Sequence, residues 1–304
     1  MQEPVTVAVM PKALANPYFE SCRQGAEEAA GLLNARLLWD GPKSSHLSSK
    51  QEGFVEGWIS ARVNAIAVSA EDALAISPSL RRAREAGVSV LAWDSDCAPD
   101  ARSFFVMPAT LEGIGKALVH AAGRILFGEG HVAVIAASAS SQNQSVALKH
   151  IETNLAQDYP GVKLVATKFC DDDQETARLL AKDLLLRQPD VKVLLTTCAP
   201  AVPGAAQAVK EAGRRDVRVV GMSSPGTCRE FIREGIVDSV VLWNTVDLGF
   251  LTVFAAHALA TGALKQGDVC LRAGRLGTVV VQDDQVRLGR PYIFNASNMD
   301  TVKF

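Results

Sequence analysis

The residues best suited to chemistry come directly after short apolar runs that are typical of β-strands. Lys12 follows the run Val5–Met10, and the turn Asn16–Phe19 comes shortly after it. Asp94 follows the run Val88–Trp93. Because parallel sheets bind ligands at the carboxyl ends of their strands, these positions are the first place to look for a site.

The second half of the chain places amides, hydroxyls and another indole ring at comparable positions. The segments are Ser140–Gln144, Cys198–Pro203, Ser223–Pro225 and Leu242–Asn244. The hydroxyls of a sugar or polyol need charge-assisted and bidentate hydrogen bonds, and its C–H faces stack on aromatic rings. These residue types therefore predict a binding site for a small polyhydroxy compound.

Catalytic motifs are missing from the same positions. The sequence contains no G-x-S-x-G or H-E-x-x-H motif and no glycine-rich phosphate loop after a strand. None of its five histidines follows a strand beside a Ser or Cys and a carboxylate. We therefore predict that the protein is not an enzyme, with no catalytic residue, no metal and no cofactor. A catalytic pair of Asp94 and Lys12 is the alternative.

Each of these residues also has a structural interpretation. Asp94 could cap the turn after its strand. Lys12 could be a solvated loop charge, and either Tyr18 or Phe19 could belong to the core. Trp243 could fill a hinge instead of contacting ligand. These alternatives stay open in the sequence.

Two groups that resemble metal sites are better explained otherwise. Asp171–Asp173 are three consecutive carboxylates without the spacing of a calcium cage, which favours a solvated helix entrance. The six cysteines show neither a C-x-x-C pair nor zinc spacing. We expect most of them to be buried free thiols, with one disulfide possible in an exported protein.

The elements that position these residues alternate between strands and helices along the chain. The predicted strands are Val5–Met10, Leu37–Trp39, Ala65–Val68, Val88–Trp93, Phe104–Val106, His131–Ala136, Lys163–Lys168, Val193–Thr196, Val217–Met222, Ser239–Trp243, Gly277–Gln282 and Tyr292–Phe294. The predicted helices are Tyr18–Leu33, Leu47–Ala61, Ser77–Ala86, Leu111–Phe127, Gln144–Tyr159, Thr176–Arg187, Gly204–Ala212, Gly226–Glu234 and Val246–Thr261. Alternation of this kind is typical of βαβ units.

The fold class predicted from this alternation is α/β, with two doubly wound parallel-sheet, Rossmann-like lobes. We expect residues 1–107 plus 244–276 in the N-terminal lobe and 108–243 plus 277–304 in the C-terminal lobe. Three crossovers would form a hinge, with ligand in the cleft.

Composition agrees with this class and excludes others. The chain has 304 residues, 48% hydrophobic and 21% charged, which suits two α/β domains. A net charge of -2 gives no reason to expect nucleic acid as a partner. No apolar run approaches the roughly 20 residues of a membrane span. The N-terminus shows no secretory signal, so we expect either a cytoplasmic protein or a sequence that begins at the mature end with an added Met. In the second case the precursor would carry a signal peptide that this sequence lacks.

Several blocks, in order and spacing, resemble the type I periplasmic sugar-binding proteins of ABC transporters, and within them the autoinducer-2 and rhamnose receptor branch. The blocks are Met10–Lys12, Asp40–Pro42, Asn64–Ala70, Val90–Asp96, Gln142–Gln144, Pro203–Ala208, Val220–Pro225, Leu242–Trp243 and Ile293–Asn295. The resemblance extends over nearly the whole chain.

The resemblance implies a ligand site with contacts from both lobes. Lys12 would donate to ligand oxygens and Asp94 would accept from a pair of hydroxyls, while Gln142 would both donate and accept. Pro203 and Ala205 would line a loop whose backbone contacts the ligand. The remaining implied contacts are Asn16, Tyr18, Phe19, Ser141, Trp243 and Asn244.

The expected ligand is a small sugar, a polyol or an autoinducer-2-like compound. Ser141 stands where the autoinducer-2 receptors carry Asp, which removes a charged acceptor. A linear polyol, a pentose or a deoxyhexose is therefore at least as good an expectation as autoinducer-2.

The resemblance implies a periplasmic receptor, expected to be a monomer, that closes on its ligand and is recognised by a membrane permease. The alternative is the effector-binding core of a sugar-responsive transcription regulator without its DNA-binding domain. Such a regulator needs an N-terminal helix-turn-helix, and here the first predicted strand begins at Val5.

Overall fold

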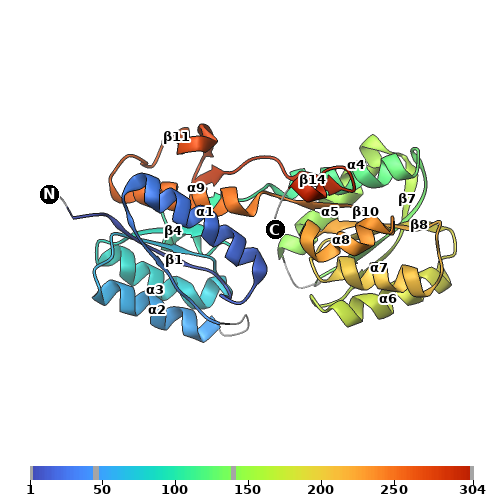
Figure 1. Ribbon diagram of the computed structural model, residues 1–304, viewed down its shortest axis with the longest axis horizontal. Helices are drawn as coiled ribbons and strands as arrows, with labels where there is room; N and C mark the ends of the chain where they lie inside the picture. Colours follow the sequence, from blue (N-terminus) through green and yellow to red (C-terminus); the bar gives the residue numbers. More distant parts are fainter. Residues whose placement is uncertain (1–2, 44–47, 138–141, 302–304) are drawn as a thin grey trace. The chain divides into compact units, whose positions relative to one another are not determined.

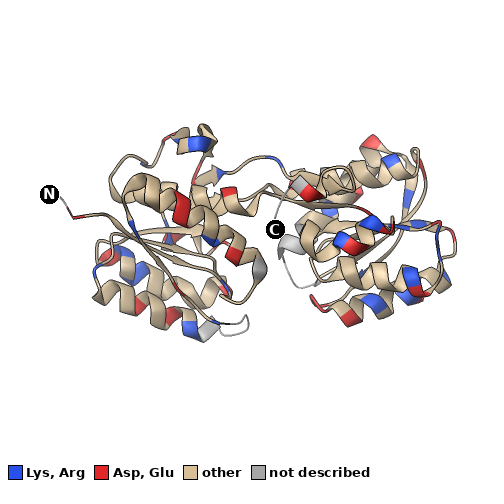
Figure 2. Cartoon of the chain, viewed as in Figure 1, with Lys and Arg blue, Asp and Glu red and all other residues tan. Residues whose placement is uncertain are grey.

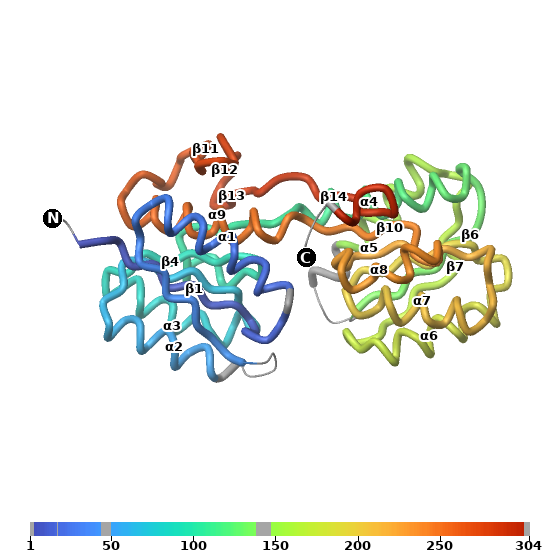
Figure 3. Tube along the Cα trace, viewed as in Figure 1, coloured from blue at the N-terminus to red at the C-terminus, as the bar shows by residue number. Residues whose placement is uncertain are grey.

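The structure, a computed structural model, describes residues 3–43, 48–137 and 142–301. The chain divides into two compact units, which are residues 1–109 with 243–289 (unit 1) and 110–242 with 290–304 (unit 2). The chain therefore passes between the units three times, as can be followed in Figures 1 and 3. Both units have the predicted α/β architecture with mainly parallel sheets.

The described part of unit 1 is a layered α/β structure around one sheet. Its strands are β1 (Thr6–Met10), β2 (Arg36–Trp39), β3 (Ala65–Val68), β4 (Ser89–Trp93), β5 (Phe104–Met107), β11 (Cys270–Arg272), β12 (Thr278–Gln282) and β13 (Gln285–Arg287). Its helices are α1 (Pro17–Leu33), α2 (Ser48–Ser60), α3 (Ala73–Glu85) and α9 (Thr245–Ala260). The sheet order is β11-β12-β13-β5-β4-β3-β1-β2.

Helices cover both faces of this sheet. Alternate strand residues, such as Ile66 and Val90, pack with Val55 of α2 and Leu80 of α3 in one buried cluster. Helices α1 and α9 cover the opposite face (Figure 1). Because both faces are buried, the central strands are continuously apolar instead of alternating.

Helices α1 and α9 approach each other closely because glycines face the contact. A Cβ on Gly25 would lie 1.8 Å from the Val246 carbonyl oxygen, and one on Gly249 would lie 1.8 Å from that of Cys22. Helix α9 is apolar on nearly all sides and almost uncharged, as Figure 2 shows. The α1–α9 pair thus forms a tightly packed layer, and α9 begins two residues after Trp243.

The described part of unit 2 has a second sheet of the same kind. Its strands are β6 (Glu129–Ala136), β7 (Gly161–Phe169), β8 (Val191–Thr196), β9 (Arg218–Met222), β10 (Val237–Leu242) and β14 (Tyr292–Asn295). Its helices are α4 (Leu111–Ile125), α5 (Gln142–Asp158), α6 (Gln174–Arg187), α7 (Ala201–Glu211) and α8 (Pro225–Arg233). The order is β14-β10-β9-β8-β6-β7, with only β14 antiparallel to its neighbour.

One predicted connection is wrong. The strand at 277–282 was expected in the second lobe, but β12 pairs with β11 and β13 in the sheet of unit 1. The turn at Asp283, where φ is 56°, folds β12 back onto β13, and β13 then pairs in parallel with β5. Which sheet a strand joins depends on pairing with a distant segment, which local sequence does not specify.

Two other expectations, for the aspartates and for the cysteines, are met in the described residues. Asp171–Asp173 are exposed, and Asp173 caps α6 by accepting a hydrogen bond from the Thr176 amide. Five of the six cysteines are buried and all six are free, with Cys270 exposed. None of the helices in the described ranges is both long and apolar enough to cross a membrane.

Candidate functional site

The carboxyl ends of β1, β3 and β4 lie side by side at one edge of the unit 1 sheet. Met10 pairs with Val68, and Val68 with Ala92. Lys12 and Asp94 therefore follow strands in the same neighbourhood, as the sequence predicts. Among the predicted site residues that the structure describes, those at this edge make the most side-chain hydrogen bonds to one another.

Asp94 is the centre of that set. Its Oδ1 accepts a hydrogen bond from the Tyr18 hydroxyl at 2.6 Å, and its Oδ2 accepts one from the Ser69 hydroxyl at 2.7 Å. A carboxylate offers about four lone-pair positions, so two remain for other donors. The side chain is half-buried, which leaves part of it accessible. The geometry suits a carboxylate that accepts two further hydroxyl protons.

The backbone at Asp94 is strained. Its φ is 60°, in the left-handed region that non-glycine residues rarely adopt. The Ser95 amide donates to the Trp93 carbonyl, which closes a three-residue γ-turn around Asp94. A left-handed non-glycine residue costs about 1–3 kcal/mol and persists only where its surroundings hold it in place.

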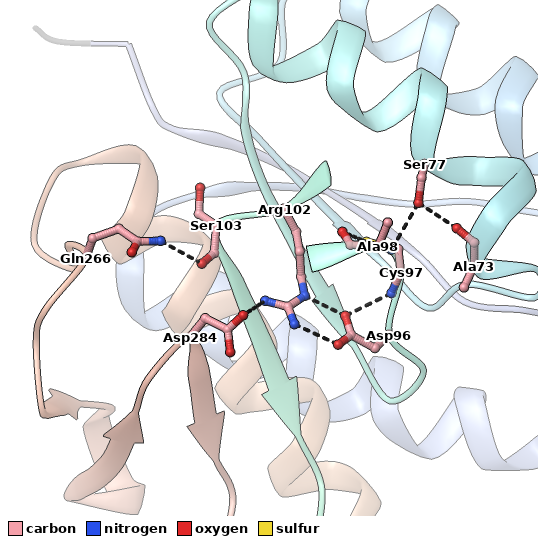
Figure 4. A network of polar contacts seen from close by, with 9 residues as sticks. All are labelled: Ala73, Ser77, Asp96, Cys97, Ala98, Arg102, Ser103, Gln266 and Asp284. Atoms are coloured by element: carbon pink, nitrogen blue, oxygen red, sulfur yellow. Dashed lines mark hydrogen bonds and ion pairs between the residues drawn. The ribbon is translucent and has the colours of Figure 1, made fainter. Parts of the chain in front are cut away.

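The loop after Asp94 is held by Arg102, which is 4% exposed. Its guanidinium donates to both carboxylate oxygens of Asp96, at 2.5 and 2.7 Å, and to Asp284 at 2.7 Å (Figure 4). Asp284 lies in the turn between β12 and β13. The C-terminal hairpin therefore fixes the segment that carries Asp94.

Tyr18 connects Asp94 to Trp243. The Trp243 indole N–H donates to the Tyr18 hydroxyl at 2.9 Å, and the two rings meet edge to face at 6.3 Å. Burial, and then the charge of Asp94, raise the pKa of Tyr18 well above its usual value, so the phenol stays protonated and continues to donate. The indole N–H of Trp243 is used within this network, which leaves only its ring for a ligand.

The other predicted residues of unit 1 have more local environments. Lys12 is half-buried, and its ammonium has no hydrogen-bond or ion-pair partner within the described ranges. Asn16 caps α1 by accepting from the Tyr18 amide, and Asn244 caps α9 by accepting from the Asp247 amide. Phe19 is 4% exposed and packs against Trp93, so it is the core residue of the Tyr18–Phe19 pair.

The predicted residues of unit 2 are less fully described. Ser141 lies outside the described residues, and Gln142 is the first residue of α5 with its side chain also outside them. Pro203 and Ala205 do not line a loop, which corrects that prediction. Both are buried within α7, which begins at Ala201.

The early start of α7 has a simple cause. Pro203 occupies the third position of the helix, where the backbone N–H would have no acceptor within the helix in any case. Proline there is compatible with helix, although from sequence alone it suggests a helix beginning after it. The predicted helix started at Gly204, three residues later than the observed one.

Ser69 was missed as a site residue. It follows β3 directly, is completely buried, and donates to Asp94. Its position after a predicted strand was the available signal. Within the described ranges no group of three or more His, Cys, Asp or Glu residues could hold a metal.

A family model described as periplasmic binding protein domain matches residues 7–264, which include both the Asp94 network and most of unit 2. The chain belongs to the periplasmic binding protein family. The members it resembles are named as sugar-binding proteins and as a sugar ABC transporter, in agreement with the predicted non-enzymatic receptor. They also favour the receptor over the transcription regulator.

Three relatives illustrate the likeness. The D-ribose/D-allose-binding protein of Pseudomonas aeruginosa is 26% identical over 242 residues, which cover 76% of this chain and 74% of the relative. A sugar ABC transporter protein from Actinomyces odontolyticus superposes with a TM-score of 0.90 at 29% identity, covering 99% and 98% of the two chains. LsrB from Clostridium saccharobutylicum, in complex with AI-2, gives 0.84 at 26%, covering 99% and 100%.

Proposed function

We propose that this periplasmic binding protein is the solute-binding component of an ABC transporter, and that it captures a small sugar, a polyol or an AI-2-like compound and delivers it to a membrane permease. In this proposal Asp94 accepts hydrogen bonds from two ligand hydroxyls. Lys12 donates to ligand oxygens, and the Trp243 ring packs against a C–H face.

One observation carries the proposal. The Asp94 carboxylate is fixed by two hydrogen bonds and a strained turn, yet keeps acceptor capacity and partial exposure. Holding an acceptor in place before the ligand arrives reduces the entropy lost on binding. The relatives named for sugars and for AI-2 support the same ligand class.

Six further residues belong to the proposed site, with less support from contacts. Gln142 and Ser141 would contribute from unit 2, together with the backbone around Pro203 and Ala205. Asn16 and Asn244 would act mainly by starting the helices that carry Tyr18 and follow Trp243.

The proposed form in solution is a monomer in the periplasm, with closure of two lobes on the ligand. Light scattering tests the first part, with a mass near 32.4 kDa expected. Small-angle scattering with and without ligand tests closure, since a closed form is more compact.

A thermal-shift screen against pentoses, deoxyhexoses, linear polyols and AI-2 tests the ligand class. A ligand at 1,000 times its Kd stabilises the native state by about 4.1 kcal/mol, which corresponds to a shift of several degrees. We expect one stereochemical series to give that shift and to be recovered unchanged. No shift with any polyhydroxy compound would contradict the proposal, and conversion of the compound would indicate an enzyme.

A further inference from the structure

Two cysteines of unit 2 lie in contact at the carboxyl edge of its sheet. Cys170 directly follows β7 and Cys198 comes shortly after β8, on either side of β6. Their sulfur atoms are 3.6 Å apart. Both residues are buried, and among the described residues no other two thiols are in contact.

Both thiols also precede the start of a helix. The Cys170 carbonyl accepts from the Asp173 amide, just before α6, and the Cys198 carbonyl accepts from the Ala201 amide, where α7 begins. The amino ends of helices carry partial positive charge, which favours a thiolate. A hydrogen bond from Cys198 lowers the pKa of Cys170, and the Asp172 amide acts in the same direction. Cys170 is thus the better nucleophile of the two.

We propose that Cys170 and Cys198 form a disulfide in the exported protein. The bond would join the loop before α6 to the loop before α7. This inference rests on the proposed function only for the compartment, because structural disulfides persist where the surroundings are oxidising.

The oxidant in this reaction is an external disulfide, carried either by a small molecule or by a thiol oxidoreductase. The Cys170 thiolate attacks one sulfur of that disulfide, forms a mixed disulfide and releases the first thiol. The Cys198 thiolate then attacks Cys170 and releases the second. Two protein thiols give up two protons and two electrons, which the oxidant takes up.

The geometry requires a modest adjustment. A disulfide has a sulfur–sulfur distance of about 2.05 Å, so the two sulfurs must approach each other by about 1.5 Å. The residues that can shift are the loop residues beside them, including the exposed Asp171 and Asp172. Because both thiols are buried in the folded chain, we expect the bond to form during folding, while an oxidant can reach them.

A metal site is the competing use of two close thiols. Structural zinc takes four ligands, and the described residues offer no third His, Cys, Asp or Glu in a group with this pair. The pair alone therefore favours a disulfide.

The test is to refold the full chain with oxidised and reduced glutathione, denature it without reductant and alkylate it. We expect four of the six cysteines to react, and a linked peptide pair containing Cys170 and Cys198. Cys170→Ser and Cys198→Ser should each leave five reactive thiols. Cys228→Ser, a matched buried cysteine elsewhere, should leave three and keep the bond.

Reductant should lower the Tm of the oxidised wild type by about 5–10 °C and leave the Cys170→Ser/Cys198→Ser double variant unchanged. Six reactive thiols in the oxidised wild type, or a linked pair of other cysteines, would overturn the proposal. Sugar-induced thermal shifts measured in both redox states separate the two proposals. If the chain binds sugar but has six free thiols, the proposed function stands and the disulfide proposal is wrong. If the chain has the linked pair but binds no sugar, the disulfide proposal stands and the proposed function is wrong.

Discussion

The carboxyl edges of the two sheets differ in what they present. In unit 1, Tyr18, Ser69 and Trp243 come from separate elements and hold Asp94 through side-chain hydrogen bonds. The described part of the unit 2 edge has instead two buried thiols and the apolar first turn of α7. Under the proposed function, the charged ligand contact therefore comes from unit 1, and the described part of unit 2 contributes shape and backbone.

The largest loss of stability should come from replacing Arg102, whose ion pairs hold the loop after Asp94 in place. Arg102→Lys replaces a buried bidentate contact to Asp96 with a single point charge. We expect the free energy of unfolding to fall by about 3 kcal/mol, because Asp96 and Asp284, each about a third exposed, lose charge-assisted hydrogen bonds of about 1.5–3 kcal/mol each. Urea denaturation measures this.

Arg81→Lys is the control for this experiment. Arg81 makes a similar two-bond contact with Asp100, but the Arg81 side chain is 40% exposed and that of Asp100 is 67% exposed. Its replacement should cost less than about 1 kcal/mol. Equal losses in the two variants would show that burial of Arg102 has no special importance.

Asp94→Asn should produce the next largest effect, and on binding. The substitution keeps the shape but removes the charge that strengthens two ligand hydrogen bonds. We expect Kd to rise at least about 100-fold in calorimetric titration. Asp283→Asn, at an exposed turn with a similar φ of 56°, should leave Kd unchanged. Unchanged binding in Asp94→Asn would remove the distinction between the two edges.

Tyr18→Phe should have an intermediate effect. It removes the donor to Asp94 and the acceptor for Trp243, and we expect a loss of about 1–2 kcal/mol at neutral pH. Burial raises the pKa of Tyr18, so its contribution is complete below pH 10.0, its usual pKa, and is lost as the pH rises through the raised value.

Denaturation at several alkaline pH values therefore distinguishes this residue from other tyrosines. The wild type should lose stability above pH 10 more steeply than Tyr18→Phe. Tyr292→Phe, at a 58% exposed position, should retain the wild-type slope. Identical slopes in all three proteins would contradict the buried phenol network.

The smallest effect is expected in unit 2. Pro203→Ala should lower the free energy of unfolding by only about 1 kcal/mol, because buried ring carbons are lost but the position in the first turn of α7 needs no amide hydrogen bond. The neighbouring Gly204→Ala is the contrast, since its Cβ would lie 2.4 Å from the Gln174 carbonyl oxygen. A large loss from Pro203→Ala would mean that the proline holds the edge in place.

Local periodicity was sufficient to predict most elements. The helix expected at Val246–Thr261 is observed at Thr245–Ala260. The strands β11 and β13 were not predicted because each has three residues, too few for a period-two pattern. The prediction of the sheet that β12 joins was wrong, because that sheet is determined by pairing of β12 with β13 and of β13 with β5.

The candidate site, like the fold, was predicted from the sequence only in part. Asp94, Tyr18 and Trp243 were predicted from position and residue type, and their direct contacts join residues up to 225 positions apart. The sequence could not show that Ser69 supports Asp94, or that Arg102 ties its loop to Asp284, because those contacts depend on tertiary packing. It also could not show that Phe19 is fully buried while Tyr18, at the same helix start, keeps a small exposed part.

A crystal structure with the ligand identified in the thermal-shift screen tests the central claim most directly. We predict that both ligand hydroxyls nearest Asp94 lie about 2.5–2.9 Å from its carboxylate oxygens, with the Tyr18 and Ser69 hydrogen bonds intact. A ligand bound elsewhere, with no contact to Asp94, would contradict the account.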